Sequence, residues 1–178
     1  SDAFVSYILH QQKEDGHWTV QGNRPPSEES LIHTTYLAIY YTEYFARGKE
    51  LEQQVKAACE KARSWLFASK AHSQEDFNGK FKALLSLGGS PQQISAARQA
   101  LLMRQREDGG WSQLPGMASD AYATGQTLHT LLAGSPAYEQ DIELLPAINR
   151  ARSYLLRTQK EDGSWFVKSR SKPIQKFF

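Results

Sequence analysis

Apolar residues recur along this chain at helical spacing. Leu51, Val55, Cys59, Ala62 and Leu66 are separated by three or four positions, and Glu, Gln, Lys and Arg lie between them. One face of a helix repeats with this period, whereas the faces of a strand alternate at every second residue. Alternating runs of β-branched residues do not occur, so the pattern predicts an all-α protein without a sheet.

Several further helices have recognisable ends. Ser90 is followed by Pro91, an N-cap residue and a proline at the first helical position. Pro146 lies at nearly the equivalent place later in the chain and predicts another helix start. Ser119 is expected to cap a helix, and glycines end the others. The predicted ranges are 28–47, 76–87, 91–103 and 119–133.

An internal repeat is the most informative feature of the sequence. Three segments align without gaps, and each reads Gln, a basic residue, Glu, Asp, Gly, any residue and Trp. They are 12–18, 105–111 and 159–165. A degraded copy starts at Ala62 and is followed by Gln74-Glu75-Asp76, without the Gly and the Trp. We therefore predict one domain over 1–178, with four units that begin near 4, 62, 97 and 151.

The helices before and after each turn differ in character. The segment 36–41 after the first turn is nonpolar or aromatic almost all round, whereas the helix before each turn is amphipathic. A helix that is apolar on every side must be covered on every side, and an amphipathic helix can face water. This contrast predicts two layers, with inner helices wrapped by outer helices.

The repeat resembles the QW repeats of the squalene-cyclase and prenyltransferase superfamily. The residues that carry the resemblance in the last unit are Arg152, Tyr154, Leu155, Gln159, Gly163 and Trp165. The resemblance implies an α/α toroid, in which inner helices surround a central cavity. That cavity holds isoprenoid chains in the cyclases and in protein prenyltransferase β subunits, and complement thioester domains use the same barrel for binding. Because the chain holds fewer helices than a closed ring, we expect a partial toroid.

The motif residues have an architectural explanation. The Gln amide is expected to reach free carbonyls at the end of its outer helix and the following turn. The Gly can take a positive φ, and the Trp is expected to stack back on the helix ends with a partner for its indole N–H. These structural residues are Gln12, Asp15, Gly16, Trp18, Gln105, Asp108, Gly109, Trp111, Gln159, Asp162, Gly163 and Trp165.

The chain contains few residues that match the catalytic residues of terpenoid cyclases. Class II terpene cyclases protonate their substrate from an Asp-x-Asp-Asp motif, which this chain lacks. Asp120 is the one carboxylate with a comparable place at the head of an inner helix, and it is a weak catalytic candidate. Acidic residues also favour helix N-termini because of the helix dipole, which is the more ordinary explanation. The chain is therefore expected not to be an enzyme; otherwise it would be a cyclase-type isomerase or lyase.

A zinc site of the prenyltransferase kind is also incomplete. Asp120-Ala121-Tyr122 resembles one of its ligand sequences without the Cys, and His33-Thr34-Thr35-Tyr36 resembles another. Two ligands fall short of the three or four that Zn²⁺ takes from proteins. Cys59 is placed on an outer helix and lacks the Cys-Gly-x-Gln sequence of a thioester. We expect no metal and no cofactor.

The net charge and the hydropathy of the chain limit the classes of partner that we expect. The net charge of +2 gives no reason to expect nucleic acid, and no apolar run is long enough to cross a membrane. No compartment is indicated. A partial ring would leave inner helices uncovered, and a large exposed apolar patch usually marks a partner surface.

The sequence therefore predicts a degenerate, non-catalytic domain whose inner-helix surface binds an apolar, isoprenoid-like ligand or a protein segment, with self-association as a further possibility. The expected binding residues are His33, Tyr36, Tyr40, Asp120, Tyr122 and His129. The alternative is part of a functional squalene or terpene cyclase whose acid motif lies outside these residues. A prenyltransferase subunit would need the missing Cys.

Overall fold

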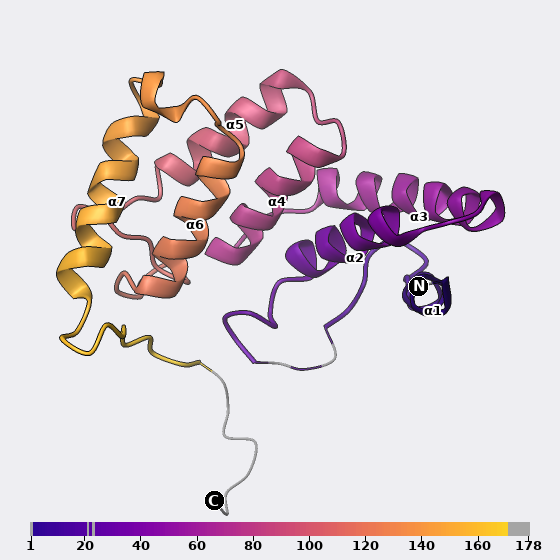
Figure 1. Cartoon of the computed structure of the whole chain (residues 1–178), viewed down its shortest axis with the longest axis horizontal. Coiled ribbons are helices and arrows are strands. Elements are labelled where there is room, and N and C mark those ends of the chain that lie inside the picture. The colour runs from indigo at the N-terminus through magenta and orange to yellow at the C-terminus, as the bar shows by residue number, and fades with distance from the viewer. Residues whose placement is uncertain (1, 21, 23, 171–178) are drawn as a thin grey trace, which may run out of the picture.

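A computed structural model describes residues 2–20, 22 and 24–170, and in these residues the protein is helical (Figure 1). No strand occurs in this part of the chain, where the one β-bridge joins Trp111 to Asp120. The all-α prediction is therefore confirmed. The helices are α1 Asp2–His10, α2 Leu31–Phe45, α3 Lys49–Ala68, α4 Gln74–Ser86, α5 Pro91–Leu102, α6 Ala121–Ala133 and α7 Leu144–Thr158, with a short 3-10 helix at Tyr138–Gln140.

The helix starts follow local capping chemistry. In α5 the Ser90 hydroxyl accepts from the Gln93 backbone N–H and the Gln93 side chain accepts from the Ser90 N–H, and Pro91 follows the cap as predicted. The predicted cap of α6 is wrong. Asp120 caps α6 by accepting from the Ala123 N–H at 2.9 Å, while the Ser119 hydroxyl donates to Asp108 instead.

The start of α4 corrects the predicted outline of the second unit. Gln74-Glu75-Asp76 forms the first turn of α4 and is not the remnant of a motif turn. Ser73 is the N-cap, and the Asp76 carboxylate accepts from the Ser73 N–H in a capping box. The second unit therefore passes from α3 to α4 through residues 69–73 alone.

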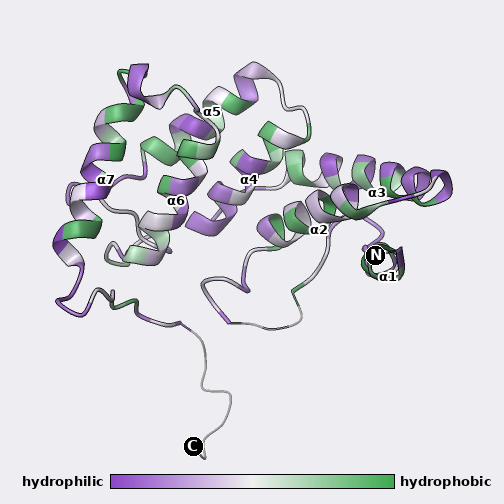
Figure 2. Ribbon diagram, in the orientation of Figure 1, coloured by the Kyte–Doolittle hydropathy of each residue, from purple (hydrophilic) through white to green (hydrophobic). Residues whose placement is uncertain are grey.

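Two sets of helices are evident in the packing. The helices α2, α4 and α6 contact one another in that order, and α1, α3, α5 and α7 pack beside them (Figure 1). Gly79 lets α4 approach α2 closely, because a Cβ there would lie 2.9 Å from the His33 Cα. Each helix carries both apolar and polar residues, as expected for helices with one buried face (Figure 2).

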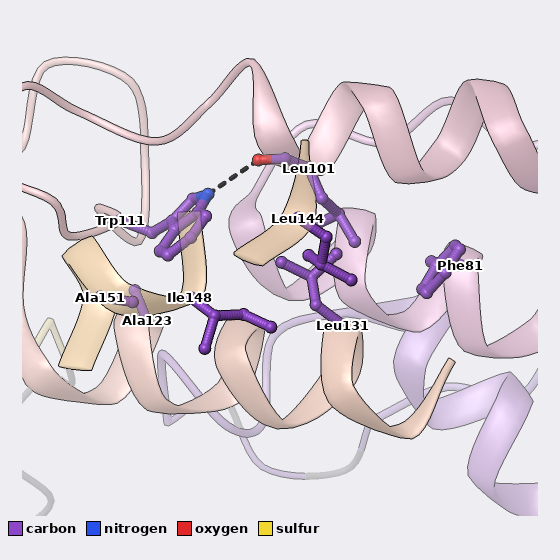
Figure 3. Close-up of a cluster of buried hydrophobic side chains, with 8 residues drawn as sticks. All are labelled: Phe81, Leu101, Trp111, Ala123, Leu131, Leu144, Ile148 and Ala151. Atoms are coloured by element: carbon purple, nitrogen blue, oxygen red, sulfur yellow. Dashed lines mark hydrogen bonds between the residues drawn. The ribbon is translucent and has the colours of Figure 1, made fainter. Parts of the chain in front are cut away.

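The buried apolar residues form several clusters, the largest of them between α4, α5, α6 and α7 (Figure 3). Trp111 is fully buried in this cluster, together with Leu101, Ile148 and Ala151. A smaller cluster around Trp18 joins α2 to α3. Trp18 and Trp111, the motif tryptophans of the first and third units, therefore each belong to a core between adjacent units.

The helix α2 is not covered on every side, contrary to the prediction from its composition. Ile39 is fully buried, but Tyr40, Tyr41 and Tyr44 are 45%, 47% and 63% exposed. One face of α2 packs on α3 and α4, and the opposite face carries aromatic rings that solvent reaches. No helix in the described residues is long and apolar enough to cross a membrane.

Candidate functional site on the inner helices

The motif glutamines join neighbouring units. Gln105 Nε2 donates to the Gly109 carbonyl at 2.9 Å and to the Ala147 carbonyl of α7 at 2.8 Å. Gln12 repeats the pattern with Gly16 and with Ala58 of α3. The contact with the turn was predicted. The second acceptor was not, because it belongs to the next outer helix rather than to the end of the glutamine's own helix.

The motif tryptophans hold the turn against its own outer helix, as predicted. Trp111 Nε1 donates to the Leu101 carbonyl ten residues earlier at 2.8 Å (Figure 3). Trp18 and Trp165 make the equivalent bonds to Ile8 and Leu155. The motif Gly, two residues before each Trp, has a positive φ of 104°, 89° or 83° in the three copies. The motif residues thus make the same local contacts in all three copies.

Within residues 2–20, 22 and 24–170, the last copy of the motif has no further helix packed against it. Trp165 is 39% exposed, whereas Trp18 and Trp111 are 4% and 0% exposed. Gln159 bonds to the Gly163 carbonyl at 2.8 Å, and no described helix accepts its second N–H. The three turns therefore have one local structure in two different surroundings.

A buried carboxylate lies where the N-terminal halves of α2, α4 and α6 meet. Glu75, in the first turn of α4, is 6% exposed. One carboxylate oxygen lies beside His33 Nδ1 of α2, and the other accepts a hydrogen bond from the Tyr122 hydroxyl of α6 at 3.2 Å. Two residues predicted from the sequence are thus brought together by a third that was not predicted.

The charge of Glu75, in the first turn of α4, affects the pKa of two neighbouring side chains, Tyr122 and Lys82. Burial and the neighbouring Glu75 charge raise the pKa of Tyr122, so this tyrosine keeps its proton and donates to the carboxylate. Lys82 lies seven residues further along α4. Burial lowers the pKa of Lys82, and the charge of Glu75 acts in the opposite direction.

Aromatic rings continue from this polar cluster along α2. The His33 and Tyr36 ring centres are 6.2 Å apart, those of Tyr36 and Tyr40 are 5.7 Å apart, and those of Tyr40 and Tyr41 are 5.3 Å apart. Burial, and to a lesser extent Tyr40, raises the pKa of Tyr36, so this tyrosine keeps its proton at neutral pH. We call the residues His33, Tyr36, Tyr40 and Tyr41 the α2 aromatic row.

The other predicted binding residues, Asp120 and His129, form no hydrogen bond or ion pair with Glu75. Both carboxylate oxygens of Asp120 are occupied: one accepts from the Ala123 N–H and the other accepts from Gln113 Nε2 at 2.9 Å. Asp120 thus fixes the start of α6. His129 is an exposed residue of α6, more than one helical turn beyond Tyr122.

Charged and metal-binding chemistry is limited in the described residues. They contain no group of three His, Cys, Asp or Glu side chains placed to share a metal ion. Cys59 is half-buried, and its thiol donates to Glu43 Oε1 at 3.0 Å. Burial and Glu43 raise the pKa of Cys59, which disfavours the reactive thiolate. The arrangement on α2, α4 and α6 therefore offers a polar end at Glu75 and an apolar row beside it.

Comparisons with known proteins add no assignment. The chain matches no protein-family model, and no curated protein matches it.

Proposed function

We propose that this chain is a partial α/α toroid of the QW-repeat class and that its inner helices bind an apolar, isoprenoid-like ligand. The repeat resemblance and the cross-unit contacts of Gln12 and Gln105 support the fold assignment. The observation that carries the binding proposal is the α2 aromatic row, in which Tyr40 and Tyr41 are open to solvent and His33 lies beside the buried Glu75. An extended chain with a hydroxyl at one end matches this sequence of apolar and polar groups.

The ligand would lie with its chain against Tyr36 and Tyr40 and its polar end near Glu75. Aromatic rings bind apolar chains through large contact areas at little entropic cost, since each ring is already held in place. The carboxylate accepts from a hydroxyl but repels a diphosphate, because like charges at close range raise the energy. We therefore expect an isoprenoid alcohol to bind more tightly than the corresponding diphosphate.

A titration with farnesol, followed by calorimetry and by amide chemical shifts, tests the proposal. Tyr40→Ala should weaken binding by about tenfold or more, as for other central aromatic contacts. Phe166→Ala is the matched control, because Phe166 is 74% exposed and lies after the last turn, and it should leave the affinity within twofold. Absence of farnesol binding, or equal losses in both variants, contradicts the proposal.

The geometry of Asp120 argues against the catalytic alternative. A general acid must present its proton to the substrate, and both oxygens of this carboxylate accept hydrogen bonds at the start of α6. Incubation with squalene or geranylgeranyl diphosphate should give no cyclised product by mass spectrometry. A cyclised product that disappears in Asp120→Asn would establish a cyclase instead.

A further inference from the structure

A pocket of about 610 Å³ lies between the end of α3, the helix α4 and the helix α5. Both α3 and α5 pack on α4, and the pocket lies where the three helices meet. Phe77, Lys80 and Leu84 line it from one face of α4, because residues three and four apart share a helix face. The volume falls in the usual range of small-molecule sites, roughly 300–1,000 Å³. The lining includes neither Glu75 nor any residue of the α2 aromatic row, so this is a separate candidate site.

Apolar side chains make up most of the lining. The helix α5 contributes three methyl groups, from Ala96, Ala97 and Ala100, and the end of α3 contributes Phe67. Alanine side chains are short, so they leave room that larger apolar residues would fill in a packed interior. A hydrocarbon group that enters the pocket gains stability in proportion to the apolar area that it removes from water.

The ionisable residues of the lining are all basic. Lys80 lies half-buried on α4, and Lys70 and His72 follow the end of α3 with exposed side chains. No carboxylate occurs among the described residues of the lining. The carboxylate of Asp76, four residues before Lys80, accepts from backbone N–H groups at the start of α4 instead. The pocket is therefore apolar with one positively charged side.

The end of α3 holds the Lys80 ammonium group in place. Lys80 Nζ donates to the Phe67 carbonyl at 3.3 Å and also to the Ser69 carbonyl. A lysine ammonium has three N–H groups, so one is left for a ligand. Within the described part of the chain, no ion pair joins Lys80 to a carboxylate. Burial lowers the pKa of Lys80, because no opposite charge offsets the loss of water around the ammonium.

We propose that this pocket binds an ionised carboxylic acid with an apolar body, of the medium-chain fatty acid class. The ligand carboxylate accepts the third N–H of Lys80, and the hydrocarbon chain lies on Ala96, Ala97 and Ala100. Opposite charges attract more strongly beside a half-buried ammonium than in water, because the effective dielectric constant is lower there. A charge-assisted hydrogen bond also fixes the orientation of the carboxylate. An alcohol of the same length lacks the charge, and Lys80 repels an amine.

Titration of the whole chain with octanoate, followed by amide chemical shifts, tests the inference. The largest shifts are expected in residues 67–72 and 93–100, which border the pocket. Octan-1-ol and octylamine carry the same hydrocarbon chain with a neutral and a positively charged end. Octanoate should bind about tenfold more tightly than octan-1-ol, the usual effect of a hydrogen bond to a charged group. Octylamine should bind more weakly than either.

Two pairs of variants separate the charge from the apolar contacts. Lys80→Met removes the ammonium at similar length, so it should weaken octanoate binding by about tenfold and leave octan-1-ol binding unchanged. Lys61→Met is its control, because Lys61 is an exposed lysine of α3 outside the lining and its loss changes the net charge equally. Ala96→Phe fills part of the pocket and should weaken both ligands by about tenfold. Its control is Ser95→Phe, at an exposed neighbour outside the lining, which should leave both affinities unchanged.

The inference is overturned if octanoate gives no shifts in these residues below its micelle-forming concentration, or if octan-1-ol binds equally well. It is also overturned if folded Lys80→Met binds octanoate as well as Lys61→Met does, or if the shifts centre on α2. Should Lys80→Met lose helix content by circular dichroism, the comparison of Ala96→Phe with Ser95→Phe decides, because both keep the Lys80 contacts with α3. Binding of farnesol to the α2 aromatic row is a separate result and changes none of these outcomes.

Discussion

Replacing Trp111 and Trp165 in turn separates the local structure of the motif from its tertiary surroundings. Both indoles donate to a carbonyl ten residues earlier at 2.8 Å, and both follow a glycine turn of the same geometry. They differ in cover, since Trp111 is fully buried and Trp165 is 39% exposed. Sequence alone predicts equal effects for the two copies, and the structure predicts unequal ones.

The expected difference follows from the area that each ring buries. Truncation of a fully buried tryptophan costs roughly 3–5 kcal/mol, so this is the expected loss for Trp111→Ala. An aromatic side chain buries about 200 Å². If 39% of that area stays exposed at Trp165, the contribution is smaller by about 2 kcal/mol at ~25 cal/mol per Å². The open site also leaves no closed cavity, so Trp165→Ala should cost about 1–2 kcal/mol by the same reasoning.

Urea unfolding followed by far-ultraviolet circular dichroism measures both values, because helix content does not depend on the residue removed. The slope of the transition should stay that of the parent chain, which makes the midpoints comparable. Equal losses in the two variants would refute the argument from cover. An unchanged midpoint for Trp111→Ala would refute the architectural role of the motif itself.

Three further predictions follow from the contacts. Gly109→Val should destabilise the protein more than Gly163→Val in the same urea assay. Both glycines have a positive φ, so valine is strained at either position. A Cβ at position 109 would also lie 2.6 Å from the Arg150 carbonyl oxygen, whereas at position 163 the nearest atom is 3.8 Å away. A hydrogen bond from the Leu144 backbone N–H, followed in size by one from Arg98, lowers the pKa of Asp141. The ionised carboxylate therefore stabilises the fold above the ordinary Asp pKa, and this stabilisation is lost as the pH falls through the lower pKa of the folded state. Asp141→Ala should destabilise the protein at pH 7, and the difference should shrink in acid; a difference that does not change with pH would contradict this. The exposed aromatic rings of α1 and α2 should drive weak self-association, visible by sedimentation as a mass that rises with concentration, and a constant monomer mass would count against it.

Most helices could be predicted because their signals are local. A cap and the residues it bonds lie within one turn, so Ser90 with Pro91 identified the start of α5. The same reasoning chose Ser119 over Asp120 for α6, because two adjacent residues were both suitable caps. In the structure the Ser119 hydroxyl donates a hydrogen bond to Asp108, in another part of the motif turn, and Asp120 is the cap.

The candidate site was predictable only in part. His33 and Tyr122 were expected on the inner helices, but Glu75 was not chosen, because it was assigned to a degraded turn. A surface carboxylate and a buried one look the same in a sequence. Burial of Glu75 depends on α2 and α6 packing on either side of α4, which brings His33 and Tyr122 to the carboxylate.

The sequence by itself determined the helical class, the repeat and the local form of each turn. Those features rest on bonds within one segment, such as the Gln105 amide to the Gly109 carbonyl and the Trp111 indole to the Leu101 carbonyl. Only the tertiary structure decided which copies are buried and which carbonyl accepts the second glutamine bond. Each of these depends on whether a neighbouring helix lies against the turn, and identical motif residues carry no information about that neighbour.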